Sequence, residues 1–201
     1  FPWLARDCAI RERPELRGRS VVFVERVGAR DVVQACSPEA EDAGAEEGMP
    51  LDQALARVDR LAVCQSDPAA EAGALRSLAW WALGVLSPRV AIDVENNSLL
   101  VDLAGTQRLH GDEGPLTNRV VAALARRGYT IQSARADAPA VALALARFGD
   151  AKDSVLPPRA GRTSIRDCVG PLSTLCLPLD PRTAETVLRR LDALGITCVE
   201  H

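Results

Sequence analysis

Three carboxylates near the middle of the chain have the types and spacing for metal chemistry. They are Asp93, Glu95 and Asp102, in and beside the segment VENNSLLVDLAGTQRLHG, residues 94–111. Asp93 and Glu95 lie two positions apart, and on a strand this alternation places both side chains on one face. Converging carboxylate oxygens are what paired magnesium ions require for phosphoryl transfer. The same alternation describes a strand with an ordinary charged, solvated face, which is the more frequent case.

Two asparagines follow these acids. Asn96 and Asn97 favour a two-residue hairpin turn, because asparagine tolerates left-handed backbone angles. We therefore expect antiparallel strands over residues 89–94 and 98–103, with Asp93 and Glu95 close to their connection.

The composition and net charge limit the functions that this protein can have. The chain has 201 residues, is 47% hydrophobic and carries a formal net charge of -3 with a pI near 5.5. This balance argues against binding nucleic acid through overall positive charge, so any such binding must be local. No run reaches the roughly 18 apolar residues that a membrane span needs. We expect a cytoplasmic protein without membrane association.

The cysteines predict neither a zinc site nor a disulfide framework. None of the six has a neighbour at metal-ligand spacing, and we expect reduced, mostly buried thiols. We expect no metal at the cysteines and no bound cofactor. The six are Cys8, Cys36, Cys64, Cys168, Cys176 and Cys198.

Hydrophobic periodicity predicts an α+β chain. A first helix is expected to stop at Pro14. A turn follows, and then a buried strand that ends near Glu25. Asp67 is expected to cap the start of a long helix. After that helix a β-β-α-β-α order has the makings of a split, ferredoxin-like sheet. The other expected elements are strands at residues 31–36, 61–65, 89–94, 98–103 and 130–136, and helices at residues 50–57, 114–128 and 138–149.

The Pro-, Gly- and Arg-rich stretch at residues 150–163 is the expected domain boundary. Beyond it, residues 179–197 read as one capped amphipathic helix and a glycine turn. The chain begins with Phe1 in an apolar pattern and stops where a further helix would follow. We therefore expect a fragment that is cut at both ends.

Three motifs carry a resemblance to a known family. PELRG, GAEEGMPL and LLVDLAGTQRLHG, with their order and spacing, resemble the fingers and palm of Y-family translesion DNA polymerases over about residues 1–150. The resemblance implies a right-hand fold, a ferredoxin-like palm with an inserted small fingers domain and the start of a helical thumb. The implied divisions are 1–10 (start of the palm, its first strand missing), 11–66 (fingers), 67–150 (palm), 151–163 (linker) and 164–201 (start of a truncated helix-hairpin-helix thumb).

The chain departs from this family where the chemistry should lie. The adjacent Asp-Glu pair that binds catalytic metal falls on Asn97 and Ser98, whose neutral oxygens cannot replace two anionic donors. The tyrosine and arginine that hold the incoming triphosphate fall on Pro38 and Glu41, and an acid there would repel phosphate.

A third departure concerns the phosphate-facing positions of a later helix. Where the family has an Asn-Lys pair and a further lysine, this chain has Ala140, Val141 and Leu145. Together the losses make the chain similar to the ImuB branch, the catalytically inactive Y-family relatives. That resemblance implies a scaffold in the SOS response that binds DNA as primer-template. Its implied partners are an error-prone C-family polymerase, a RecA-like ImuA protein and the sliding clamp, through a region beyond residue 201.

Two other functions remain open from the sequence. The chain could be an active polymerase in which Asp93 or Glu95 replaces the missing pair, or a palm-fold interaction module with no DNA role. An acidic run, residues 39–47, would repel nucleotide or meet a basic partner. The candidate DNA contacts are Arg126, Arg127, Arg189 and Arg190, which equally suit solvated helix faces.

Overall fold

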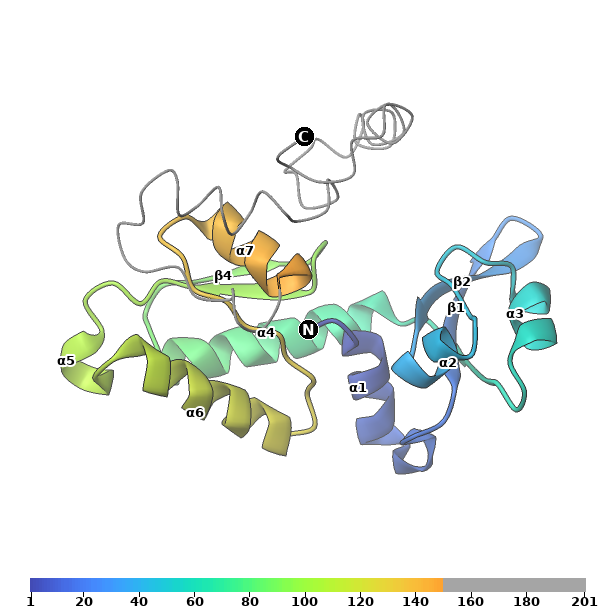
Figure 1. Cartoon of the computed structure of the whole chain (residues 1–201), viewed down its shortest axis with the longest axis horizontal. Helices are drawn as coiled ribbons and strands as arrows, with labels where there is room; N and C mark the ends of the chain where they lie inside the picture. Colours follow the sequence, from blue (N-terminus) through green and yellow to red (C-terminus); the bar gives the residue numbers. More distant parts are fainter. Residues whose placement is uncertain (150–201) are drawn as a thin grey trace, which may run out of the picture. The chain divides into compact units, whose positions relative to one another are not determined.

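The computed structural model describes residues 1–149 and has an α+β fold (Figure 1). Contacts divide the chain into two compact units, Phe1–Ile131 and Gln132–His201. The first unit holds every described element except the helix α7 (Pro139–Phe148). The expected helix at residues 179–197, together with Arg189 and Arg190, lies outside the described residues.

Helix α1 (Leu4–Glu12) has two buried faces. Leu4 packs against Leu75 and Leu78, whereas Ile10 joins a second cluster with Val21 and Phe23. The helix ends as predicted before Pro14, which opens the 3-10 turn η1 (Pro14–Leu16). In Figure 1, α1 accordingly lies between a three-stranded sheet and the remaining elements of the unit. Because both clusters depend on it, α1 joins the two parts of this unit through apolar packing.

The three-stranded sheet has the order β2-β1-β3. Strand β1 (Val21–Val27) pairs antiparallel with β2 (Arg30–Cys36) and parallel with β3 (Ala62–Gln65). The N–H of Val33 donates to the Met49 carbonyl at 2.9 Å, so a loop covers part of the outer edge of β2. Helix α3 (Leu51–Arg57) packs on β2. The predicted strands here, and the helix at residues 50–57, are confirmed within one or two residues.

A short helix, α2 (Pro38–Asp42), was not expected from the sequence. Ser37 forms its N-cap and is fully buried. The Ser37 hydroxyl accepts the N–H of Ala40 at 3.3 Å and that of Val21 at 3.1 Å, and donates to the Arg19 carbonyl at 3.2 Å. Ser37 therefore joins the start of α2 to the start of β1. Proline at the first helical position, as here, suits a helix start.

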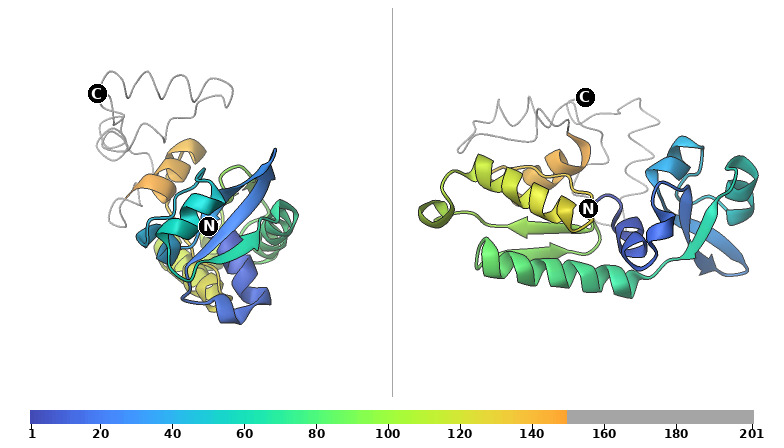
Figure 2. Two further views of the ribbon diagram at one scale, coloured as in Figure 1. Left: turned by 90° about the vertical axis from the view of Figure 1, so that its right-hand side faces the viewer. Right: turned by 90° about the horizontal axis from the view of Figure 1, so that it is seen from below.

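Helix α4 (Pro68–Val85) begins as predicted with Asp67, whose carboxylate accepts the N–H of Ala70 at 2.9 Å. It leads into the hairpin of β4 (Val90–Asp93) and β5 (Ser98–Val101). The short α5 (Gln107–His110) and the longer α6 (Glu113–Arg126) follow. Figure 2 shows α4 and α6 running alongside this hairpin. A shared cluster, which includes Leu86 and Leu116, packs α4 and α6 against the strands.

The expected strand at residues 130–136 is wrong. Only Arg135 forms an isolated bridge there. The N–H of Thr130, which a strand would use in its ladder, donates instead to the carboxylate of Asp7. In residues 1–149 the hairpin sheet therefore has β4 and β5 alone. Among these residues, no helix is both long and apolar enough to cross a membrane.

Candidate functional site

The turn between β4 and β5 brings together most of the candidate polar residues. Strand β4 ends at Asp93, which pairs with Ser98, so residues 94–97 form the connection. This turn is longer than the expected two-residue one. Glu95 lies in the turn and is exposed, and the expectation that it shares a strand face with Asp93 is therefore wrong.

The Asp93 carboxylate is already satisfied by the turn. One of its oxygens accepts the backbone N–H of Asn96 at 3.1 Å, and the other accepts the side-chain amide of Asn96 at 2.7 Å. Asx contacts of this kind stabilise turns, because the side chain replaces a backbone acceptor. Asp93 ends the strand and closes the turn.

Asn97 and Ser98 also serve the hairpin backbone. Asn97 has a φ of 46°, the left-handed conformation that asparagine tolerates. The Ser98 hydroxyl donates to the carbonyl of Asn96 at 2.7 Å. The backbone nitrogen of Phe1 donates to the carbonyl of Asn97 at 3.1 Å. Each of these contacts fixes the shape of the turn without using an anionic group.

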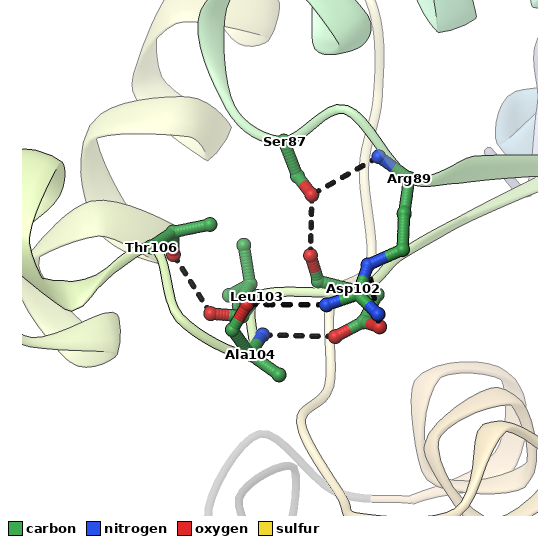
Figure 3. Close-up of polar contacts among 6 residues, drawn as sticks. All are labelled: Ser87, Arg89, Asp102, Leu103, Ala104 and Thr106. Atoms are coloured by element: carbon green, nitrogen blue, oxygen red, sulfur yellow. Dashed lines mark hydrogen bonds and ion pairs between the residues drawn. The ribbon is translucent and has the colours of Figure 1, made fainter.

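Asp102 follows the end of β5 that lies away from the turn, and Figure 3 shows its polar contacts. Its carboxylate pairs with Nε of Arg89 at 3.2 Å and accepts the N–H of Ala104 at 2.8 Å. The Ser87 hydroxyl donates to the Asp102 carbonyl at 2.5 Å. At about 3.3 Å per strand residue, Asp102 lies about 13 Å along β5 from Ser98. It cannot share an ion with groups at the turn.

The structure therefore keeps Asp102 away from Asp93 and Glu95, the other two candidate carboxylates. Within residues 1–149, no three His, Cys, Asp or Glu side chains form a group that could hold a metal ion. Chemically, the turn offers neutral amide, hydroxyl and carbonyl oxygens, which bind magnesium more weakly than carboxylates do.

Pro38 and Glu41 lie in the first turns of α2. Pro38 opens the helix, and Glu41 is exposed. Partial desolvation raises the pKa of Glu41, a hydrogen bond from the side chain of Trp3 opposes this change, and Asp42 and Glu47 reinforce it. The contact with Trp3 was not anticipated, since no local pattern links residues so far apart in sequence. The position is acidic, and Glu41 itself offers no positive charge to a triphosphate.

Part of the acidic run is paired. Arg57 forms an ion pair with Glu46 at 3.3 Å and also donates to the Gly44 carbonyl at 3.3 Å. The two side chains are 43% and 73% exposed, so solvent screens the pair strongly. Asp42 and Glu47 are exposed. The surface beside α2 is thus predominantly negative.

The described arginine candidates differ from each other. Arg126 is exposed in the last turn of α6. The guanidinium of Arg127 lies 4.9 Å from the ring centroid of Trp81, a cation–π contact. Arg126 is therefore the more available of the two for a phosphate.

Four further side chains have clear places in the structure. Trp81 packs against the core as a partly buried residue, whereas Trp80 is 74% exposed. His110 has a structural contact, because its Nε2 lies 3.0 Å from the Leu86 carbonyl at the end of α4. In α7, Leu145 is fully buried.

Two comparisons with known sequences place the chain among related proteins. The model of the impB/mucB/samB family matches residues 5–147. Protein ImuB from Caulobacter vibrioides, in strains NA1000 / CB15N and ATCC 19089 / CIP 103742 / CB 15, is 41% identical over 102 residues. That match covers 51% of this chain and 22% of ImuB, so it spans about a fifth of the relative's length.

Solved structures show the same fold at low sequence identity. DinB from Sulfolobus solfataricus superposes with a TM-score of 0.73 at 16% identity, over 98% of this chain and 56% of that one. Dbh DNA polymerase in its insertion ternary complex superposes with a TM-score of 0.67 at 15% identity, over 98% of this chain and 57% of that one. The chain thus spans just over half of each polymerase. With the family model matching residues 5–147, the chain belongs to the impB/mucB/samB family and has the fold of a Y-family DNA polymerase.

Proposed function

We propose that this chain is the polymerase-like part of a non-catalytic scaffold protein that assists error-prone translesion DNA synthesis after DNA damage. The observation that carries the proposal is the β4–β5 turn. Asn97 and Ser98 stand at the positions that match the family's acidic pair, and hydrogen bonds within the turn occupy their neighbour Asp93. The hairpin keeps its shape without the charges that metal-dependent catalysis requires.

The structure also disfavours displaced acids. Both Asp93 oxygens already accept hydrogen bonds from Asn96, so a magnesium ion would compete with the turn for this carboxylate. Glu95 is exposed in the turn. Asp102 pairs with Arg89 at the far end of β5. Asp102 therefore cannot join the acids at the turn without rebuilding the hairpin.

The surface beside α2 supports the same conclusion for nucleotide. Catalysis of phosphoryl transfer depends on cations that clamp the phosphate oxygens. Glu41 stands where the family has an arginine, and Asp42 and Glu47 lie near it. A triphosphate would meet repulsion here instead of a clamp.

A role in DNA damage tolerance is supported by membership of the impB/mucB/samB family and by similarity to ImuB. Dbh, which shares the fold, is a DNA polymerase solved in ternary complexes. We propose that this chain binds primer-template DNA through local arginines, Arg126 among them. With a pI near 5.5, such binding should be weak and confined to a patch.

The wider assembly is part of the proposal. It comprises an error-prone C-family polymerase, a RecA-like ImuA protein and a sliding clamp bound through a region beyond residue 201, acting in the cytoplasm during the SOS response. The domain divisions implied by the resemblance, with fingers at residues 11–66 and palm at residues 67–150, belong to the same proposal.

Primer extension tests the proposal. The full-length protein is incubated with primed template and the four deoxynucleotides, first with magnesium and then with manganese. We expect no nucleotide incorporation with either ion. Incorporation that disappears in Asp93→Ala would show that the acids have moved and would overturn the scaffold proposal.

DNA binding needs a separate measurement. We expect salt-dependent binding of primed DNA, with Arg126→Ala weakening it about two- to tenfold at low salt through the loss of one phosphate contact. Arg60→Ala is the matched control, because Arg60 is 92% exposed and pairs only loosely, at 4.0 Å, with Asp59. Absence of any salt-dependent affinity would favour an interaction module with no DNA role.

A further inference from the structure

Charge is distributed unevenly over the helices that flank the β4–β5 hairpin. The chain has 27 Asp and Glu residues and a net charge of -3. None of these acids lies in residues 72–92, which include most of α4, or in residues 114–136, which include most of α6. The arginines of these two stretches are Arg76, Arg89, Arg119, Arg126, Arg127 and Arg135. An acidic chain therefore has a local excess of positive charge here.

Helices α4 and α6 pack side by side, so their charges lie on neighbouring surfaces. Leu78 of α4 and Leu124 of α6 belong to one core cluster. The guanidinium of Arg127, directly after α6, lies 4.9 Å from the ring centroid of Trp81 in α4. The end of α6 therefore brings positive charge to the side of α4.

Trp80 projects from α4 away from the core. Its side chain is 74% exposed, whereas Leu78 and Ala82, two positions before and after it, are buried. Because two residues correspond to about 200° around a helix, these neighbours point to the core and Trp80 points to solvent. Gly84 lies one turn later, where an added Cβ would meet nothing within 4 Å. The indole is therefore open to a partner.

Cationic side chains lie beside this indole on its own helix and on the neighbouring one. Arg76 precedes Trp80 by one turn, about 6 Å along the helix axis and on the same side. Arg76 is exposed, and it forms no ion pair with any residue in the described part of the chain. Arg127 stacks on Trp81, the next residue of α4, and Arg126 beside it is exposed. An exposed aromatic ring is thus combined with positive charge from two helices.

This combination is typical of surfaces that bind single-stranded nucleic acid. Unpaired bases stack on aromatic side chains, and guanidinium groups beside them contact the phosphates. A protein partner would gain less, because Arg76, Ser77 and Gly84, three of the four nearest helix neighbours of Trp80, offer little apolar surface. The bases of a duplex are already stacked on each other, so an exposed indole favours a single strand.

We propose that the exposed face of α4 binds single-stranded DNA, with a base stacked on Trp80 and phosphates contacted by Arg76 and the arginines at the end of α6. This inference rests on the DNA-binding role proposed above. It adds to that role a stacking site, which distinguishes single-stranded from double-stranded DNA.

Binding of a fluorescein-labelled oligothymidylate to the full-length protein, followed by anisotropy, tests the stacking contact. Trp80→Ala should weaken binding at least about fivefold, whereas Trp80→Phe, which keeps an aromatic ring, should stay within about threefold of the wild type. Leu109→Ala is the matched control, because it removes an 83% exposed apolar side chain on α5. Since Trp80 is exposed, its replacement leaves the core intact.

Two further readouts separate charge from stacking. Arg76→Ala should lower the slope of log K against log[salt] by about 0.7, the value for one phosphate contact on a single strand. Arg60→Ala, at a 92% exposed arginine that follows α3, should leave the slope unchanged. The oligothymidylate should quench tryptophan fluorescence in the wild type, and this quenching should be smaller in Trp80→Phe, because a stacked base quenches an indole.

A duplex of the same length shows whether the contact is specific to single strands. Trp80→Ala should leave the affinity for this duplex within about twofold of the wild type. An equal loss on both DNAs would overturn the proposal. If Trp80→Ala binds oligothymidylate as tightly as the wild type does, the stacking site is wrong, although the DNA-binding role stands. If the wild type binds neither oligothymidylate nor primed DNA, the DNA-binding role itself fails.

Discussion

At the scale of single residues, the polar groups of this chain are used to close turns and caps. Asp93, Asn96 and Ser98 bond to one another in the β4–β5 turn, and Ser37 joins α2 to β1. These roles depend on which group lies within reach, and the sequence shows only which groups are polar. This is why Asp93 and Glu95 resembled a pair of ligands in the sequence.

Ser37 offers a direct test of this view. Ser37→Ala removes an N-cap and leaves the buried N–H of Val21 without its acceptor, so we expect a loss of about 1–2 kcal/mol in the free energy of unfolding. Urea denaturation measures it. Ser77→Ala is the control, because that exposed hydroxyl bonds only to the Gly73 carbonyl within α4. Equal effects from the two variants would show that the Ser37 network adds nothing.

Asp7 should make stability depend on pH. Burial raises the pKa of Asp7 above 3.8, although hydrogen bonds from Thr130 and the charge of Arg6 oppose the change. When the pKa of an acid is higher in the folded protein than in the unfolded chain, the acid stabilises the fold fully at pH values below its unfolded pKa. This contribution is lost as the pH rises through the folded pKa. Asp7→Asn does not titrate. From pH 3 to 7, the unfolding free energy of the wild type should therefore fall relative to that of Asp7→Asn.

At the scale of elements, strong periodicity made most of the fold predictable. Helices α1, α4, α6 and α7 and the strands β1 to β5 lie where the apolar pattern placed them. The short α2 was missed because its acidic residues carry no apolar repeat. The strand expected at residues 130–136 failed because Asp7, far away in sequence, takes the N–H of Thr130. Local patterns cannot reveal a partner of that kind.

Glycines in α4 give a prediction at this scale. A Cβ added to Gly73 or Gly84 would meet nothing within 4 Å, and neither residue has a positive φ. Gly73→Ala should therefore stabilise the protein by about 0.5–1 kcal/mol, since alanine favours a helix. Gly128→Ala, at a φ of 86°, should instead destabilise it by about 1 kcal/mol or more. Thermal unfolding measures whether each substitution raises or lowers the stability of the protein.

At the scale of the whole molecule, the first unit depends on α1. Leu4 is 1% exposed in the core shared with α4 and α6. Leu4→Ala should lower the unfolding free energy by about 2–4 kcal/mol. Because α1 also packs on the three-stranded sheet, amide exchange should accelerate in β1 as well as in α4. Acceleration confined to α4 would show that the two parts unfold independently.

Two thiols, the buried Cys36 and the partly buried Cys8, can report on the opening of these cores. Desolvation raises the pKa of Cys8 and of Cys36 to about 11, so at pH 7 only about one thiol in ten thousand is ionised. Alkylating reagents attack the thiolate, and the folded chain should hardly react at either position. Cys36 lies in the core of the three-stranded sheet, whereas Cys8 packs beside Leu4. The rates at which iodoacetamide labels Cys8 and Cys36, followed separately from the other four cysteines, therefore report how often each core opens, without any probe being introduced.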